Sequence, residues 1–233
     1  MQKARSSFGA SEAMQHVTRI VAIRHGETAW NLDTRLQGHL DIPLNATGHW
    51  QAQRTAGALV EEGISAIYSS DLLRALQTAQ ALGDALSLPV VTDTRLRERG
   101  FGVFEAHTFA EIEARWLAEA RRWTQRDPDF APEGGESLSE VYARCIDAVQ
   151  TLADAHAGQT IALVAHGGVM DCLYRAATRQ GLQTKRSWPL GNASINRLLH
   201  TGVDLTLIGW SDTRHLDVVA LDESGDAAGV SRA

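Results

Sequence analysis

The sequence predicts a three-layer α/β/α fold, in which helices cover both faces of a mostly parallel sheet. Apolar segments rich in β-branched residues alternate along the chain with amphipathic segments of helical period. Two of the apolar segments, 19–24 and 160–165, run directly into a His-Gly turn. Strands of a parallel sheet end at one edge, where such sheets bind ligands, so we expect both histidines in one crevice.

The first predicted strand, residues 19–24, is followed along the chain by a predicted helix. The strand reads RIVAIR and stops at a glycine, as a buried strand would. The helix is predicted from apolar residues at helical spacing, with Thr47 placed to cap it and Gly63 following as a stop signal. These apolar residues are Trp50, Ala56, Leu59 and Val60.

A second strand and helix follow in the same order. Residues 66–69 form a short predicted strand, and Ser70 and Asp71 open a helix whose apolar residues share one face. Leu88 then starts a third strand, in the sequence LPVV. The alternation of strands and helices implies right-handed crossovers between parallel strands.

A long amphipathic helix precedes the second histidine strand. Ser137 and Glu140 have the spacing of a capping box at its start, and Gly158 ends it. Residues 160–165, TIALVA, are almost entirely apolar, which predicts a strand buried on both faces.

The end of the fold is predicted to be a hairpin. Segments 193–200 and 205–210 alternate more loosely around a Thr-Gly-Val-Asp turn. A hairpin here offers an edge for pairing in a homodimer. Open α/β sheets of this size are commonly one domain, so we expect a single domain at 18–217, with flexible tails at 1–17 and 218–233.

Composition excludes several classes of function. The chain has 44% hydrophobic and 21% charged residues, which are ordinary globular values, and its net charge of -6 gives no footprint for nucleic acid or an anionic membrane. It also lacks the apolar stretch of a secretory signal and any apolar run of the roughly 20 residues that span a bilayer. We therefore expect a cytoplasmic protein without nucleic-acid or membrane partners. Cys145 and Cys172 are expected to be buried, reduced thiols.

The two His-Gly turns carry residue types suited to phosphoryl transfer. An imidazole nitrogen of His25 can attack phosphorus, while the neighbouring Arg24 binds phosphate oxygens and offsets their charge. His166 occupies the equivalent turn, and the small size of Gly167 and Gly168 lets a ligand approach the backbone at the start of the next helix.

Six segments, in order, match the motifs of one enzyme family. Their sequence and spacing resemble the histidine phosphatase superfamily, also called phosphoglycerate mutase-like, over about residues 19–210. The resemblance implies the three-layer fold of that family. The segments are RHGETAWN at 24–31, LQGHLDIPLNATG at 36–48, YSSDLLRALQTA at 68–79, LRERGFGVFEAHT at 96–108, GGES at 134–137 and LVAHGG at 163–168.

The resemblance implies that the protein hydrolyses a small phosphorylated metabolite through a phosphohistidine. By it, His25 is the nucleophile, and Arg24, Arg74 and His166 surround the phosphate. Asn192 is a weaker candidate for the same crevice. Further positions expected to bind phosphate or substrate are Asn31, Gln37, Gly38, Thr28 and Gly167.

Hydrolysis of an alkyl ester also needs a proton donor for the leaving group, which later takes a proton from water. Glu98 occupies the family's glutamate position, flanked by Arg97 and Arg99. Glu105 competes for the role, because many family phosphatases have Trp-Glu-Gly where this chain has Phe-Glu-Ala. We expect Glu98 to be the proton donor, with Glu105 as the open alternative.

Two other functions stay open. A 2,3-bisphosphoglycerate-dependent mutase uses the same phosphohistidine but generally has a longer insertion than the stretch between Glu98 and His166; Arg121 and Arg122 are similar to the paired arginines of mutases. A non-catalytic phospho-ligand binding protein would be favoured only if His25 or its arginines were missing. The nine histidines show no metal-ligand spacing, so we expect no metal and no other cofactor.

Specificity is expected to come from a cap at residues 104–136. This segment holds Trp116, Trp123 and Phe130 near three arginines, which suit either packing or recognition of a second anionic group.

Overall fold

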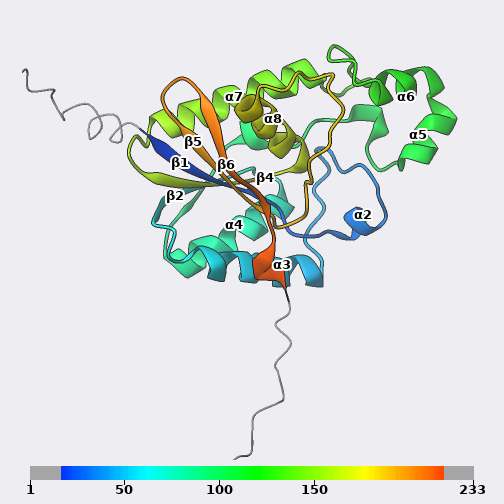
Figure 1. The fold of residues 1–233 in the computed structure, drawn as a ribbon. Coiled ribbons are helices and arrows are strands. Elements are labelled where there is room, and N and C mark those ends of the chain that lie inside the picture. Colours follow the sequence, from blue (N-terminus) through cyan, green and yellow to red (C-terminus); the bar gives the residue numbers. More distant parts are fainter. Residues whose placement is uncertain (1–16, 218–233) are drawn as a thin grey trace, which may run out of the picture.

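A computed structural model of the chain describes residues 17–217, which form a six-stranded sheet between two layers of helices (Figure 1). The order across the sheet is β3-β2-β4-β1-β5-β6. Apart from Val17, the predicted tails lie outside the described residues. The strands are β1 (Thr18–Arg24), β2 (Ile64–Ser69), β3 (Val90–Thr92), β4 (Thr160–Ala165), β5 (Ile195–His200) and β6 (Leu205–Asp212).

Helices cover both faces of the sheet, as predicted. α7 and α8 lie on one face and α3 and α4 on the other, whereas α5 and α6 lie beyond the end toward which β1 runs (Figure 1). Three short 3-10 helices also occur within the described residues. The α-helices are α2 (Ala29–Leu32), α3 (Ala46–Leu59), α4 (Leu73–Leu86), α5 (Phe109–Arg115), α6 (Leu117–Thr124), α7 (Leu138–Asp154) and α8 (Gly167–Thr178).

The alternating side chains of β1 supply the cores on the two faces. Ile20 and Ala22 pack in the cluster beneath α7 and α8, and Val21 and Ile23 pack in the cluster beneath α3 and α4. Residues 160–165 of β4 are buried along their whole length, as the apolar sequence predicts. Burial of each large aliphatic side chain contributes roughly 1.5–3 kcal/mol, so the centre of the sheet is its most strongly held part.

The strand register brings the two histidine turns together. β1 pairs in parallel with β4, and Arg24 lies opposite Ala165 at the end of that ladder. The next residue of each chain segment is a histidine, so His25 and His166 leave adjacent strands at the same edge. The mostly parallel sheet is completed by antiparallel β5 and β6, which form the predicted hairpin with β6 at the sheet edge.

The start of α3 differs from the prediction. Asn45, not Thr47, is the N-cap, and its side chain accepts a hydrogen bond of 2.7 Å from the backbone N–H of Gly48. The backbone of Asn45 is extended, whereas Thr47 already lies inside the helix. A side chain can cap only from the last non-helical position, so Asn45 takes the role. Gly63 lies in the turn before β2, with φ at +66°, rather than at the end of the helix.

α4 also begins later than predicted. Ser70 and Asp71 precede it, and Leu72 occupies the N-cap without a side-chain cap. The carboxylate of Asp71 instead binds the Arg97 guanidinium at 2.5 and 2.7 Å. By contrast, the capping box of Ser137 and Glu140 at the start of α7 is confirmed.

The cap region has a small core of its own. α5 and α6 pack around four buried side chains, Phe104, Ile112, Ala120 and Phe130. Cys145 and Cys172 are free and buried, as expected. Within residues 17–217, no helix combines the length and apolar content that crossing a lipid bilayer requires.

Candidate active site

The site lies at the edge of the sheet where β1 and β4 end. The imidazole rings of His25 and His166 face each other there, with centroids 5.2 Å apart and planes inclined by 56°. Both are almost fully buried, with 3% and 0% of their surface exposed. Their closeness follows from the parallel register of the two strands.

The tautomer of His25 is fixed by its neighbour. Nδ1 lies 2.7 Å from the carbonyl oxygen of Gly26, and because a carbonyl only accepts, Nδ1 carries the proton. Nε2 has no partner among the described residues and keeps its lone pair. Burial, followed by the charges of Arg24 and Arg74, holds the pKa of His25 well below 6.5, so the ring is neutral and able to attack an electrophile.

His166 is a buried imidazole with unused hydrogen-bonding atoms. It is the N-cap of α8, and neither of its ring nitrogens has a partner within residues 17–217. Burial, followed by the nearby charges of Arg74 and Arg24, lowers its pKa well below 6.5. A buried polar ring left unpaired costs stability, which indicates a ligand position beside it.

Arg74 is a buried cation and Arg24 a partly buried one, and backbone carbonyl groups hold both. Arg24 donates to the carbonyl of Leu190, and Arg74 donates to those of Gly38 and Leu40 at 2.8 and 2.9 Å. The Nε atoms of both arginines are buried and unpaired in the described structure. Burial lowers the pKa of Arg24, and it lowers the pKa of Arg74 to about 10. Neither arginine forms an ion pair within residues 17–217, and cations removed from water in this way form an anion-binding site.

A small cavity of about 140 Å³ is lined by His25, Arg24 and Arg74, whereas His166 lies outside its lining. Nine of its ten lining residues lie within the motif segments, and the tenth, Arg35, directly precedes the second segment. Gln37 presents a buried side-chain oxygen that has no partner in the described part of the chain. The lining consists of Arg24, His25, Asn31, Arg35, Leu36, Gln37, Gly38, Arg74, Glu98 and Phe101.

Thr28 is placed differently from the expected binding position. It is fully buried and caps α2 in a reciprocal pair with Asn31. It lines neither this cavity nor a second cavity of about 510 Å³ that adjoins it. It therefore positions Asn31. Asn192 lies next to this pair. Its Nδ2 donates to the carbonyls of His25 and Gly26 at 3.0 and 3.3 Å and to Oδ1 of Asn31 at 3.3 Å.

Glu98 is held at the start of α8. Its carboxylate accepts hydrogen bonds from the backbone N–H of Gly168, at 3.0 and 3.1 Å, and from that of Arg99 at 2.8 Å. A Cβ at position 168 would lie 2.1 Å from Oε1 of Glu98, so this approach requires a glycine. Gly167, the first residue of α8, lies against the Arg24 guanidinium.

Glu105, the other candidate acid, lies outside both cavities. Its Oε1 accepts from the backbone N–H groups of His39 and Phe101, both at 3.0 Å, and so fastens two loops together. Glu98, in contrast, lines the small cavity and the larger one. The geometry favours Glu98 as the acid that can reach a bound ester.

The loop that carries Glu98 is clamped from behind. Arg144 forms a two-point ion pair with Glu136, at 2.7 and 2.8 Å, and donates to the backbone carbonyls of Arg95, Arg97 and Glu98. Glu136 in turn accepts from the N–H of Gly100 at 2.8 Å. Sequence reasoning singled out neither role, because residues 95–100 and 136–144 meet only in the folded chain.

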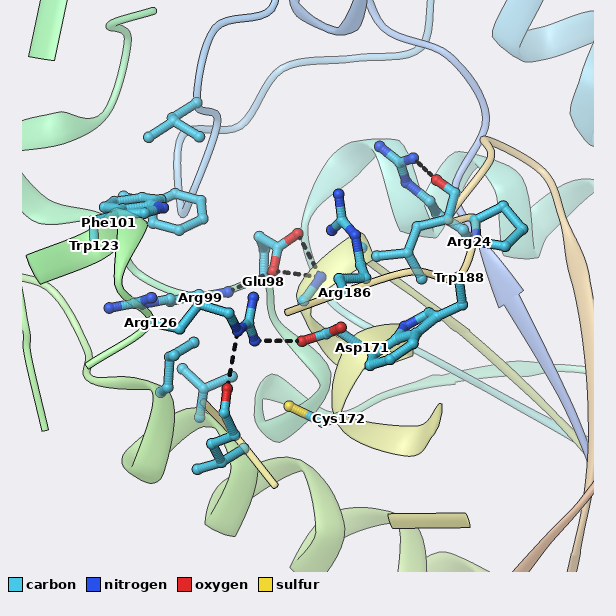
Figure 2. Close-up of a pocket in the computed structure, with 18 residues that line it drawn as sticks. Arg24, Glu98, Arg99, Phe101, Trp123, Arg126, Asp171, Cys172, Arg186 and Trp188 are labelled. Carbon is cyan, nitrogen blue, oxygen red and sulfur yellow. Dashed lines mark hydrogen bonds and ion pairs between the residues drawn. The ribbon is translucent and has the colours of Figure 1, made fainter. Parts of the chain in front are cut away.

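A larger cavity of about 510 Å³ adjoins the small one, sharing Arg24, Leu36, Glu98 and Phe101 in its lining (Figure 2). Arg99, Arg126 and Arg186 also line it, from three separate segments. Arg126 belongs to the predicted cap at residues 104–136, whose arginines were expected to suit either packing or recognition of a second anionic group, whereas Arg99 and Arg186 were not expected to bind substrate.

The other arginines of the cap do not line the larger cavity. Arg122 pairs with Asp127, and Arg115 contacts the His107 ring. Arg121 lines neither the large nor the small cavity. The cap aromatics Trp116, Trp123 and Phe130 all pack against Phe104, and of the three only Trp123 also lines the larger cavity. Their positions in the sequence gave no sign of this division.

Within the part of the chain that the structure describes, no group of three or more His, Cys, Asp or Glu side chains is placed to hold a metal ion. The positive charges at the site are those of arginine. The arrangement offers a neutral imidazole nucleophile, donors for several anionic oxygens and a carboxyl group beside them, which together suit transfer of a phosphoryl group.

Comparison with known proteins agrees with this chemistry. A sequence model described as histidine phosphatase superfamily (branch 1) matches residues 20–213. Phosphoglycerate mutase-like protein 4 of Arabidopsis thaliana is 39% identical over 210 residues, covering 88% of this chain and 90% of its own.

Two solved structures with phosphatase names share the fold. The mycobacterial glucosyl-3-phosphoglycerate phosphatase, in complex with VO3, superimposes with a TM-score of 0.75 at 34% identity, over 84% of this chain and 99% of that one. The phosphoserine phosphatase of Entamoeba histolytica, in complex with 3-phosphoglyceric acid, gives a TM-score of 0.77 at 28% identity, over 85% and 99% of the two chains.

Proposed function

This chain belongs to the histidine phosphatase superfamily, whose members are phosphatases or mutases, and on that basis we propose that it is a metal-independent phosphomonoesterase acting on a small phosphorylated metabolite. The observation that carries the proposal is the neutral, buried His25, which has a free Nε2 and lines a cavity together with two arginines that form no ion pair within residues 17–217. A phosphate monoester supplies both the electrophile and the anion that such a cavity needs.

In the first step, the lone pair of His25 Nε2 forms a bond to phosphorus as the bond from phosphorus to the ester oxygen breaks. Arg24 and Arg74 stabilise the negative charge on the transferred phosphoryl group, and His166 donates a hydrogen bond to it. The hydrogen bond from Nδ1 to the Gly26 carbonyl stabilises the positive charge that develops on the ring of His25.

Glu98, in its protonated form, gives its proton to the departing alkoxide. Water then attacks the phosphohistidine, Glu98 takes a proton from that water, and inorganic phosphate leaves with His25 restored. The position of Glu98 supports this role, because it lines both the phosphate-sized cavity and the larger cavity where a leaving group has room.

The proposal is tested by following phosphate release from a panel of phosphomonoesters in the presence of EDTA. We expect hydrolysis that survives the chelator, together with a phosphoenzyme that is labile in acid and stable in base, as a phosphohistidine is. Loss of all turnover on chelation, with recovery on adding a divalent cation, would contradict the metal-independent mechanism.

A phosphoglycerate mutase is the second candidate, favoured by the name of the 39% identical relative. A mutase returns the phosphoryl group from the histidine to a phosphoglycerate instead of to water, so water has to be excluded from the site. Incubation of 3-phosphoglycerate with and without 2,3-bisphosphoglycerate distinguishes the two. Bisphosphate-dependent isomerisation with little phosphate release identifies a mutase, and phosphate release without isomerisation identifies a phosphatase.

A further inference from the structure

The larger cavity lies where the leaving group of the ester would extend. It shares Arg24 and Glu98 with the phosphate-sized cavity, so a molecule seated in both has its scissile bond beside Glu98 (Figure 2). Its volume of about 510 Å³ falls within the range of roughly 300–1,000 Å³ typical of small-molecule sites.

The larger cavity is lined by more positive than negative side chains, even when the arginine that binds the transferred phosphate is not counted. Arg99, Arg126 and Arg186 line it in addition to Arg24, against the carboxylates of Glu98 and Asp171. Arg24 serves the phosphate cavity, and Glu98 is neutral when it acts as proton donor. Three guanidinium groups then face one carboxylate.

That one carboxylate is already shared. Oδ2 of Asp171 accepts from Arg126, at 2.9 Å, and from Arg175 behind it, also at 2.9 Å. Arg175 is fully buried and also donates to the carbonyls of Gly181 and Thr184, which fastens the segment leading to Arg186. Asp171 therefore offsets Arg175 at least as much as Arg126, and the cavity keeps a surplus of positive charge.

Each lining arginine has donors left over. Arg99 binds the carbonyls of Glu136 and Phe130 through Nε and Nη2, lies over the Trp123 ring, and leaves Nη1 without a partner in the described structure. Arg126 likewise uses only Nε and Nη2.

Arg186 is exposed, and its side chain makes no hydrogen bond or ion pair within residues 17–217. Figure 2 shows its guanidinium between Glu98 and Arg24, opposite Arg99 and Arg126.

Burial makes the charge of Arg99 costly without a ligand. Only 6% of the Arg99 surface is exposed, its side chain forms no ion pair with a described carboxylate, and burial lowers its pKa to about 10. Trp123, Trp188 and Leu182 supply apolar walls beside the arginines, which weaken the screening of charge by water. An anionic group in the cavity would relieve the repulsion among the guanidinium groups.

We propose that Arg99, Arg126 and Arg186 form a subsite for a second anionic group, a carboxylate or a phosphate, on the leaving group of the ester. The subsite makes the protein selective for esters whose alcohol portion is itself an anion. The inference rests on the proposed phosphomonoesterase function and adds the class of substrate.

The test compares esters that differ only in the second anion. O-phosphoserine and O-phosphoethanolamine share the ester and the ammonium group and differ in one carboxylate; 1,3-propanediol bisphosphate and monophosphate differ in one phosphate. We expect kcat/KM to favour the anionic member of at least one pair by about tenfold or more, and the pair that shows it identifies the anion. No preference in either pair would overturn the subsite.

Arg186→Ala gives the sharpest variant, because this side chain supports no other described residue. We expect it to reduce the preference ratio about fivefold or more, and Arg186→Lys to retain part of it. Lys185→Ala, which removes the same charge from the adjacent exposed residue outside the cavity, is the matched control and keeps the wild-type ratio. An equal loss of the ratio in both variants would show a diffuse charge effect and contradict the subsite.

The two proposals fail in different ways. A protein that releases no phosphate from any ester, including p-nitrophenyl phosphate, contradicts the phosphomonoesterase function. In that case calorimetric affinities for phosphoserine and phosphoethanolamine still measure the preference, and equal affinities contradict the subsite as well. Turnover of all esters without preference contradicts the subsite alone.

Discussion

His25 and His166 meet across the β1–β4 ladder with their rings 5.2 Å apart, yet neither ring donates to the other. Nδ1 of His25 is occupied by the Gly26 carbonyl, whereas both nitrogens of His166 are unpaired within the described residues. The two histidines are thus chemically distinct, one set up as a nucleophile and the other as a donor to whatever the nucleophile attacks.

Replacement of the nucleophile should abolish turnover without unfolding the protein. We expect His25→Ala to lower kcat by at least about a thousandfold, because the residual catalysis of such sites comes only from binding and electrostatics. Phosphate release measures the loss, and circular dichroism checks the fold. His49→Ala, at an exposed position on α3, is the control, and turnover retained in His25→Ala would rule out the phosphohistidine.

The roles of Glu98 and Glu105 can be distinguished by how strongly the effect of each substitution on hydrolysis depends on the leaving group. Glu98→Gln is expected to slow hydrolysis of alkyl phosphates by about 10²–10⁴-fold, and to slow p-nitrophenyl phosphate much less, because that leaving group departs without a proton. Glu105→Gln keeps an oxygen that can accept from His39 and Phe101, so a small effect on both substrates is expected. If Glu105→Gln showed the larger dependence on the leaving group, the assignment would be reversed.

Acid should destabilise the folded state through the two buried imidazoles. Burial and nearby arginines lower the pKa of His25 and of His166 in the folded state, while the unfolded chain binds a proton near 6.5. Unfolding therefore takes up protons below about pH 6.5. The contribution of the two neutral histidines to the free energy of unfolding is fully present above that pH. Below it, the free energy of unfolding decreases by up to about 1.4 kcal/mol per pH unit for each histidine.

Denaturant titrations between about pH 5 and 7.5 measure this effect. Below pH 6.5, we expect His166→Gln to reduce the slope of the unfolding free energy against pH by about 1.4 kcal/mol per pH unit, the value for one proton. This change in slope does not depend on the absolute stability of the variant. His49→Gln, which replaces an exposed histidine, should leave the slope unchanged. A wild-type slope in His166→Gln would mean that His166 is protonated in the folded protein.

Asn192 provides a test of how the nucleophile's backbone is held. Its Nδ2 faces three acceptors, the carbonyls of His25 and Gly26 and Oδ1 of Asn31. Asn192→Asp replaces that donor with an acceptor, which costs about 1–3 kcal/mol. We expect kcat/KM to fall more for Asn192→Asp than for Asn192→Ala, although aspartate is closer to asparagine in shape. The reverse order would show that Asn192 contributes only by filling space.

Much of the fold could be predicted from the sequence, because the patterns that specify its strands and helices involve residues close together in the chain. The apolar runs at 19–24 and 160–165, and the capping box at Ser137, each depend on residues adjacent in the chain. The starts of α3 and α4 were placed less well. Thr47 and Ser70 have suitable side chains, but whether a residue caps a helix depends on its backbone angles, and these are set by packing of the preceding loop.

By itself, the sequence determined that two His-Gly turns end two buried strands, and that arginines and a glutamate of one family pattern accompany them. Only the tertiary structure decided which glutamate lines the cavities and which arginines gather beside Glu98. Arg99, Arg126 and Arg186 come from segments far apart in the chain. Periodicity and short motifs report on neighbours in sequence, whereas a cavity is formed by side chains that meet only when the sheet, the cap and the loop after α8 have packed together.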